Sequence, residues 1–521
     1  MEKTDTLGGE VLSRRSLFTA GGLAAGAAAS GAVWPARAAG VDWERLRARL
    51  RGALVLPRDA DYERAKQVQI VEFDAVRPRA IAYCVTPEDV RECVLFARRH
   101  DIRAVPRSGG HNFAGWSTTE GGLVIDLSRM NRVAAGASTV FMGPGAQSVD
   151  VMAALRPYGV QVINGLCPTV CAGGFLTGGG IGWQTRKFGL GSDRMVSARV
   201  VLSDGRVVRC SAEREPDLFW ALRGGGGGNF GVVVDFEVRP TRVPVITSFT
   251  LSWSWDHALD VLAAWQRWSV DGSVNLNSSI GAVLMDARPG TEPSVLLQGG
   301  YLGPRTELDA ALDRLYAAAG ARPAVATVDE LPYDKAMMRL YGCADVTVEQ
   351  CHRVGQNPEA VLRRQGMQRE RHRLFDAPLD AAGLDAALTA FLADRRPGQL
   401  RYLGFTALGG EASRPGRTET AYVHRDALFL IRYTLGMDDP TPAAEDAAAA
   451  QAWVDRGFGV LDPRSNGHSY INFPDPSLRD WAWSYHGVNH PRLLDVRRRY
   501  DPAGFFRHPQ SVGGRTGRPS T

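Results

Sequence analysis

The chain has 521 residues, of which 44% are hydrophobic and 22% charged, so it has the composition of a soluble globular protein with room for two or three cores. A chain of this size needs neither a metal nor disulfides to fold, unlike a small stapled domain. Its formal net charge of +5 is modest for this length and gives no reason to expect nucleic acid as a partner.

The first 38 residues are typical of an export signal. Ser13 to Phe18 read S-R-R-S-L-F, a twin-arginine pattern, and an uncharged run rich in alanine and glycine leads to the A-x-A site Ala36 to Ala38. We therefore expect residues 1–38 to be a signal peptide for the Tat export machinery, and the mature protein to be secreted or extracytoplasmic. The run is too weakly apolar for a stable membrane span, so no stable membrane association is expected after cleavage, with an uncleaved anchor as the alternative.

A strand, a helix and a second strand precede the first glycine loop. Ala80 to Val85 and Ile102 to Val105 have the composition of strands, and Thr86 with Pro87 begins a helix as N-cap and first helical residue. The chain then reads P-R-S-G-G-H from Pro106 to His111. A glycine pair beside an arginine suits a pyrophosphate, because backbone N–H groups can approach the oxygens closely and the guanidinium adds charge.

Glycine is densest in the next segment, where it makes up seven of the eighteen residues from Gly165 to Gly182. Such a stretch suits backbone that lies flat against a large planar ligand, because any Cβ would push that ligand away. Between the two glycine segments, 123–127 and 139–142 read as strands, Gly143-Pro144-Gly145 reads as a turn, and 148–158 reads as a helix.

These segments resemble the flavin-binding segments of the FAD-linked oxidases of the berberine bridge enzyme type, in the PCMH or vanillyl-alcohol oxidase superfamily. In that family the histidine of P-R-S-G-G-H bonds to the 8α-methyl of FAD, and the cysteine of G-x-C-P-x-V bonds to flavin C6. Those positions are His111 and Cys167 here, so the resemblance implies FAD attached by two covalent bonds. The structural alternatives are a polar loop with an exposed histidine and a small buried thiol. Cys171, where relatives have glycine, is either a bystander or a competitor for oxidation.

A third glycine segment follows a hairpin centred on Asp204-Gly205 and a short helix over 217–223. It contains G-x-G-x-x-G at Gly226, Gly228 and Gly231, but a helix enters and a strand (232–238) leaves, which is the reverse of a Rossmann fingerprint. The segment instead resembles the family's D-L-F-W-A-L-R-G-G-G-G-G-N-F-G element, which closes the FAD site. The residues expected to bind the cofactor are Arg107, Ser108, Gly109, Gly110, His111, Gly143, Gly145, Cys167, Gly173, Gly174, Gly178, Gly179, Gly180, Gly182, Gly228, Gly231, Val232 and Asn489.

The composition changes after Pro240, where glycine runs stop and strand-like segments alternate with helices such as 258–268 and 307–319. We expect a PCMH-type FAD-binding domain at 39–240, an α+β substrate domain with an antiparallel sheet at 241–460, a C-terminal segment at 461–515 that returns to the FAD domain, and a tail at 516–521. Arg432 lies in an apolar strand. We favour a position at a sheet edge or in a structural ion pair, with a role in a functional site as the alternative. Trp253, Trp255 and Tyr402 could stack on a substrate ring, but aromatics on strands are more often core.

The C-terminal segment also resembles the family, through Y-x-N-[YF] at Tyr470 to Phe473 and Y-x-G-x-N-x-x-R-L from Tyr485 to Leu493. Relatives commonly use a tyrosinate from this tail as the base, so Tyr470 is the candidate, with packing in the domain interface as the alternative. Many relatives have a second tyrosine where this chain has Phe473. In the family the residue three positions after the attached cysteine gates oxygen, with valine open and leucine closed. That residue is Val170, for which the alternative is an ordinary strand valine.

The sequence thus predicts a secreted FAD-dependent oxidase that takes hydride from an alcohol or C–H of a sugar or secondary metabolite and reduces molecular oxygen to hydrogen peroxide. The alternatives are a flavin dehydrogenase with another acceptor and a non-catalytic binding protein with the same fold. No metal-binding motif is found, and none of Walker A, H-E-x-x-H, G-x-S-x-G or paired C-x-x-C is present. Of the seven cysteines, Cys343 and Cys351 could pair, but no disulfide is assumed for a chain folded in a reducing compartment.

Overall fold

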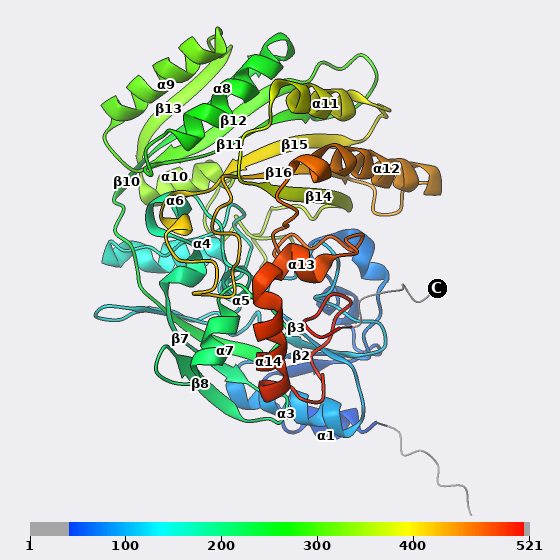
Figure 1. Cartoon of the computed structure of the whole chain (residues 1–521). Coiled ribbons are helices and arrows are strands. Elements are labelled where there is room, and N and C mark those ends of the chain that lie inside the picture. The colour runs from blue at the N-terminus through cyan, green and yellow to red at the C-terminus, as the bar shows by residue number, and fades with distance from the viewer. Residues whose placement is uncertain (1–40, 515–521) are drawn as a thin grey trace, which may run out of the picture. The chain divides into compact units, whose positions relative to one another are not determined.

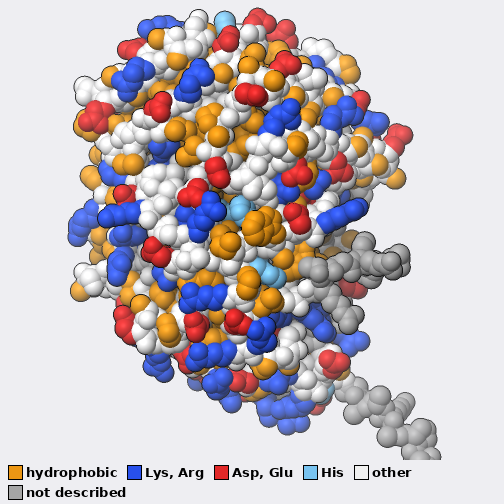
Figure 2. Space-filling view, viewed as in Figure 1, with side chains coloured by type: hydrophobic (Ala, Val, Ile, Leu, Met, Phe, Trp, Pro, Cys, Tyr) orange, Lys and Arg blue, Asp and Glu red, His pale blue; other side chains and the backbone are white. Residues whose placement is uncertain are grey.

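The computed structural model describes residues 41–514, coloured from blue to red in Figure 1. The predicted export signal at 1–38 lies outside the described residues. The fold is of the α+β class, as predicted, and the strands within residues 41–514 form three sheets. No helix within 41–514 is both long and apolar enough to cross a membrane. Basic and acidic side chains are interspersed over the face shown in Figure 2.

A small sheet carries the first glycine loop at the end of one of its strands. Its strand order is β1 (Ala53–Val55), β2 (Ala80–Tyr83), β4 (Leu123–Asp126) and β3 (Ala104–Arg107), with the last three parallel. Helix α3 (Pro87–Arg99) connects β2 to β3 and begins at the predicted cap, where the Thr86 hydroxyl accepts a hydrogen bond from the Asp89 N–H. The predicted strand–helix–strand unit is therefore present, with β4 inserted between its two strands.

A second sheet is antiparallel and follows the first along the chain. Its order is β5 (Val133–Ala135), β6 (Val140–Met142), β9 (Val232–Val238), β7 (Met195–Val201) and β8 (Val207–Ser211). Strands β7 and β8 form the predicted hairpin, and Gly205 in its turn has φ +84°, a conformation that glycine adopts at little cost. The third glycine segment lies between α7 (Pro216–Leu222) and β9, as expected.

The largest sheet has seven strands and is antiparallel. Its order is β13 (Val325–Pro332), β10 (Val245–Ser254), β12 (Ser294–Tyr301), β11 (Leu276–Leu284), β15 (Leu400–Ala407), β16 (Phe429–Met437) and β14 (Met367–Phe375). One face packs under α8 (Ala258–Val270), α9 (Arg305–Ala319), α11 (Ala381–Leu392) and α12 (Ala444–Leu461), and together they form the largest apolar core (Figure 1). Trp253 belongs to this core and the partly buried Trp255 packs against it, in agreement with the core interpretation. The opposite face of β14, β15 and β16 is left for the site described below.

The remaining elements are short. The other α-helices are α1 (Trp43–Arg47), α2 (Tyr62–Ala65), α4 (Ser148–Leu155), α5 (Ala172–Thr177), α6 (Thr185–Phe188), α10 (Tyr333–Leu340), α13 (Trp481–His486) and α14 (His490–Tyr500). Single 3-10 turns span Val71–Ala75, Arg156–Tyr158, Gly191–Arg194, Trp255–His257, Gly410–Ser413, Asp462–Arg464 and Gly487–Asn489. A disulfide joins Cys343 to Cys351 in the loop after α10.

The C-terminal segment returns to the glycine segments, as the resemblance implied. Helix α14 lies beside α7 (Figure 1), and the Arg497 guanidinium donates to the carbonyl oxygen of Asn229 at 3.2 Å. The Val512 N–H donates to the side-chain oxygen of the same asparagine at 3.0 Å. Because Asn229 belongs to the third glycine segment, residues far apart in the sequence meet around one loop.

Candidate active site

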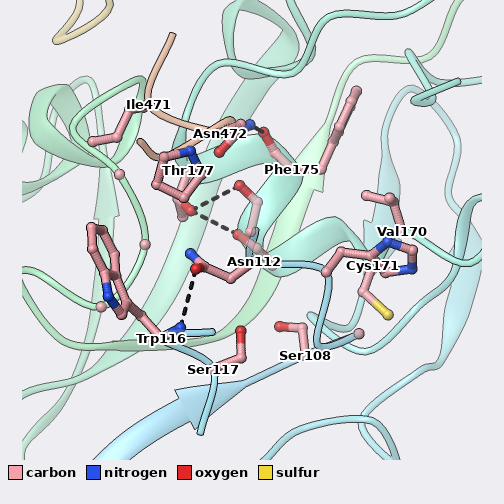
Figure 3. A pocket seen from close by; sticks show the side chains of 18 of the residues that line it. Ser108, Asn112, Trp116, Ser117, Val170, Cys171, Phe175, Thr177, Ile471 and Asn472 are labelled. Carbon is pink, nitrogen blue, oxygen red and sulfur yellow. Dashed lines mark hydrogen bonds between the residues drawn. The ribbon is translucent and has the colours of Figure 1, made fainter. Parts of the chain in front are cut away.

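A cavity of about 550 Å³ is enclosed by the three glycine segments, the C-terminal segment and the open face of the large sheet. Its volume lies within the range of small-molecule and cofactor sites. Figure 3 shows Val170 and Cys171 on one side, Trp116 on the opposite side, and Ile471 and Asn472 of the C-terminal segment above them. The Asn112 side chain is fixed at the centre because its oxygen accepts a hydrogen bond from the Trp116 N–H at 3.1 Å.

The structure places twelve of the residues proposed from the sequence on the cavity wall. They are Ser108, Gly109, Gly110, His111, Cys167, Val170, Gly173, Gly174, Gly228, Gly231, Val232 and Tyr470. These residues come from four separate parts of the chain, which the fold brings to one space.

Seven of the other proposed residues do not line the cavity, and their contact with the cofactor stays a prediction. They are Gly143, Gly145, Gly178, Gly179, Gly180, Gly182 and Asn489. A Cβ at Gly143 would lie 1.9 Å from the Met130 carbonyl oxygen, and one at Gly178 would lie 2.0 Å from the Asn472 side-chain oxygen. These glycines permit close packing of the protein against itself. The Asn489 amide donates to backbone carbonyls, including that of Arg417 at 2.7 Å.

Arg107 does not line the cavity either, because its guanidinium faces the protein. Its Nε donates to the Asp126 carboxylate at 2.5 Å, and Nη2 donates to the Ala65 carbonyl at 2.6 Å. Both ion-pair partners are about 4% exposed. Arg107 thus fixes the end of β3 from behind, and a bound pyrophosphate would depend on backbone N–H groups of the loop.

His111 and Cys167 lie on the same wall and share a neighbour. The Nε2 atom of His111 is 2.9 Å from the Thr169 hydroxyl, and the Cys167 sulfur is 3.9 Å from that same oxygen. Burial lowers the pKa of His111 to about 4, so the imidazole is neutral at pH 7. Burial also raises the pKa of the Cys167 thiol.

Cys171 is the second cysteine on this wall. Its sulfur lies 3.3 Å from the Gly145 carbonyl oxygen, and burial raises the pKa of its thiol. A Cβ at Gly109 would come within 2.9 Å of this sulfur, so Cys171 and the first glycine loop pack directly together. The thiol is therefore held in its neutral form by packing.

Tyr470 projects from the C-terminal segment with its phenolic oxygen between two donors. The Gly180 N–H donates to that oxygen at 2.8 Å, and the Asn472 amide donates at 2.9 Å. Burial raises the pKa of Tyr470 to about 12, and the two donated hydrogen bonds oppose that rise. Because both partners donate, the oxygen is arranged to hold negative charge. Gly180 thus contributes to the site through its backbone N–H.

Sequence reasoning missed the part of the wall formed by the large sheet. Gln368 on β14, Thr406 on β15, and Leu430 with Arg432 on β16 line the cavity. Strand β16 is internal, so the edge position considered for Arg432 is wrong. Its ion pair with Glu370 is long, with Nη1 to Oε2 at 3.9 Å. Period-two alternation along β16 was the available signal, but the strand could not be aligned with β14 and β15 from one sequence.

The wall fits a large ligand with polar ends, as FAD is. Gly174 in α5 borders the cavity, and a Cβ built there meets nothing within 4 Å, so the protein leaves this position open to a ligand. The Gln69 side-chain oxygen and His508 Nδ1 are buried in the wall and have no partner within the described residues. Unpaired buried polar atoms are costly, so their presence on the wall indicates a polar ligand.

Comparisons with known proteins identify the family. Residues 78–211 match the model of the FAD binding domain, and residues 469–513 match the model described as berberine and berberine like. The chain is 29% identical over 470 residues to an uncharacterized FAD-linked oxidoreductase of Bacillus subtilis, covering 89% of this chain and 97% of that protein. It is 30% identical over 465 residues to the chitooligosaccharide oxidase of Gibberella zeae, covering 84% and 87% of the two chains.

A solved structure shows the same fold. The berberine bridge enzyme of Eschscholzia californica superposes with a TM-score of 0.79 at 23% identity, covering 91% of this chain and 99% of the other. The chain therefore belongs to the berberine-bridge-enzyme-like family of FAD-linked oxidoreductases and is an FAD-dependent oxidoreductase.

Proposed function

We propose that this protein is an oxidase that converts an alcohol, or a ring C–H, of a sugar or secondary metabolite and reduces molecular oxygen to hydrogen peroxide. The observation that carries the proposal is the single cavity, which joins the wall of His111 and Cys167 to the wall of Tyr470 and the open sheet face. The chitooligosaccharide oxidase among the relatives supports a carbohydrate as one substrate class. Bound FAD would supply the hydride acceptor and the electrons for oxygen.

The residues of this chain would hold the two partners and move one proton. His111 and Cys167 would hold FAD, and Gln368 and Thr406 would contact the substrate from the sheet. Tyr470 would act in its phenolate form, which the N–H of Gly180 and the amide of Asn472 stabilise by donating to the phenolic oxygen, and this oxygen would take the proton of the substrate hydroxyl. We further propose export by the Tat route, on the evidence of residues 1–38.

The test is a panel of saccharides, aryl alcohols and polyketide glycosides, with hydrogen peroxide as the readout. Protein that stays yellow after acid precipitation and releases peroxide with a member of the panel would support the oxidase. Substrate-dependent bleaching without peroxide, relieved by a quinone, would favour the dehydrogenase alternative. Neither bleaching nor peroxide with any donor would favour a non-catalytic binding protein.

Two covalent attachments are expected, because the side chains of His111 and Cys167 lie on one wall around Thr169. Mass spectrometry of tryptic peptides should find flavin on Cys167 in His111→Ala and on His111 in Cys167→Ala. Cys171→Ala is the matched control and should keep both attachments. A His111→Ala protein with no flavin-bearing peptide, or a Cys171→Ala protein that loses one, would contradict this assignment.

Oxygen is expected to reoxidise the reduced enzyme next to Val170. Its carbonyl oxygen accepts from the Ser148 N–H at 3.0 Å, which fixes the backbone while the side chain faces the cavity. Val170→Leu should slow reoxidation by air about 10- to 100-fold in stopped flow, because an added methylene in a close-packed site costs on the order of 1–3 kcal/mol. Val170→Ala, which adds no volume, is the control. Equal rates in wild type and Val170→Leu would show that this position is not the oxygen gate.

A further inference from the structure

Arg432 faces the cavity because of the pleat of β16. Phe429, Ile431 and Tyr433 alternate into the core under the helices, while Leu430 and Arg432 point to the other face and line the cavity. Strand β16 is paired on both sides, with Arg432 opposite His372 on β14 and Gly404 on β15. The sheet therefore fixes the position from which the guanidinium enters the site.

Rings hold the guanidinium beside the proposed base. The Arg432 guanidinium carbon lies 5.4 Å from the ring centre of Tyr402 and 5.4 Å from that of Phe473. The Phe473 ring in turn contacts the Tyr470 ring edge-on, at a centroid distance of 5.4 Å. Gly404 leaves space for the Tyr402 ring, since a Cβ there would lie 2.0 Å from a ring carbon. The Phe473 ring thus contacts both the Arg432 guanidinium and the Tyr470 ring.

The charge of Arg432 is poorly matched by the protein. The nearest carboxylate is that of Glu370, whose Oε2 accepts from the Thr434 hydroxyl at 2.7 Å and lies 3.9 Å from Arg432 Nη1, beyond hydrogen-bond distance. Burial raises the pKa of Glu370, and the Arg432 charge opposes that rise. The Nε atom of Arg432 is buried and has no partner within the described residues. No aspartate or glutamate of residues 41–514 lines the cavity.

Arg432 is a partly buried cation, with its side chain 21% exposed, that faces a cavity without a carboxylate on its wall, and this arrangement calls for an anion from the ligand. Arg507, the other arginine of the wall, is exposed and lies near Arg103, so it is in a different electrostatic setting. A guanidinium presents a planar fork of N–H donors that matches a carboxylate with two parallel hydrogen bonds.

We propose that the substrate carries a carboxylate. Arg432 binds this carboxylate, while Tyr470 takes the proton of the hydroxyl that is oxidised. This inference rests on the proposed function and narrows it to acidic alcohols, such as a sugar acid or a hydroxymethyl aryl acid. A site built to hydrogen-bond a charged group of the substrate discriminates against an analogue that lacks that group. Arg432 is then a specificity-determining residue of the site.

The test uses two matched pairs of compounds on the FAD-loaded full chain. One pair is D-glucuronate and D-glucose, and the other is 4-(hydroxymethyl)benzoate and its methyl ester. For each pair we would measure the ratio of kcat/KM for the acid to that for the neutral compound, and the Kd of each compound from perturbation of the flavin absorption spectrum under anaerobic conditions. The variants are Arg432→Gln, Arg432→Lys and Glu370→Gln.

The acid is expected to be preferred in at least one pair, and Arg432→Gln should lower that ratio about 10- to 100-fold, the range for a hydrogen bond to a charged group. Arg432→Lys keeps the positive charge but lacks the planar fork of donors, so its acid-to-neutral ratio should lie between those of the wild type and Arg432→Gln. Glu370→Gln should change the ratio in the opposite direction, because it removes a competing negative charge. If Arg432 only pairs with Glu370, the two glutamine variants would shift stability alike and leave the ratio unchanged, which would overturn the inference.

The binding measurement separates this inference from the proposed function. If none of the four compounds is oxidised but the acids bind more tightly than their neutral partners and Arg432→Gln removes the difference, the carboxylate site stands and the proposed oxidation fails. If oxidation is found and the neutral compound is preferred in both pairs, the oxidase stands and the carboxylate site fails.

Discussion

Gly174→Val is expected to give a folded protein that no longer retains FAD. A side chain at this position projects into the cavity, where a Cβ meets no protein atom within 4 Å and only the cofactor can be displaced. Valine is also a better helix residue than glycine, so α5 should not be weakened. The variant should lose nearly all of the flavin absorbance, while its circular dichroism spectrum should match that of the wild-type apoprotein.

Gly459→Val is the matched control for this substitution. Gly459 also lies in a helix, α12, is exposed, and a Cβ there likewise meets no atom within 4 Å, but it does not border the cavity. This variant should keep its flavin. Retention of FAD by Gly174→Val at the level of Gly459→Val would mean that the cofactor does not lie against α5.

Tyr470→Phe is expected to lower kcat by about 10²- to 10⁴-fold, the range for loss of a general base, while FAD remains bound. In the wild type, log kcat should rise with pH, because the pKa of Tyr470 is raised to about 12 and the fraction of phenolate grows as pH approaches that value. The phenylalanine variant should lose this rise. Rapid-reaction measurements of flavin reduction between pH 6 and 10 would follow both effects.

Tyr485→Phe is the control for loss of a buried hydroxyl. Tyr485 belongs to the same C-terminal segment, is 1% exposed, and its oxygen accepts from the Asp475 N–H at 2.8 Å, but it does not line the cavity. It should lose stability without losing the pH dependence. If Tyr470→Phe keeps the wild-type pH profile, the proton is taken by another group.

Local elements were predictable where short-range chemistry determines them. The Thr86 cap, the turn at Gly205 and the strand over 232–238 follow from side-chain hydrogen bonding, backbone freedom and apolar composition within a few residues. The rejection of a Rossmann reading also rested on local order, since α7 enters the third glycine segment and β9 leaves it.

Two features were not predictable because they depend on tertiary partners: the direction in which a side chain points, and what lies next to a glycine on the side where a Cβ would be. Gly143 and Gly174 both lie in glycine-rich stretches and were both predicted to bind the cofactor. Gly143 packs against the Met130 carbonyl, whereas Gly174 borders the cavity. The Arg107 side chain pairs with Asp126 on β4, a residue 19 positions further along the chain. Arg432 required the pairing of β16 with β14 and β15, which no motif in 241–460 indicates.

The return of the C-terminal segment has a consequence for biosynthesis. His111 and Cys167 leave the ribosome long before Tyr470, Asn472 and Phe473 and before Val512, which contacts Asn229. Until these later residues emerge, one side of the cavity is open to water, and domains fold from the N-terminus during synthesis. A chain terminated upstream of Tyr470 would therefore carry His111 and Cys167 without the wall that completes the cavity.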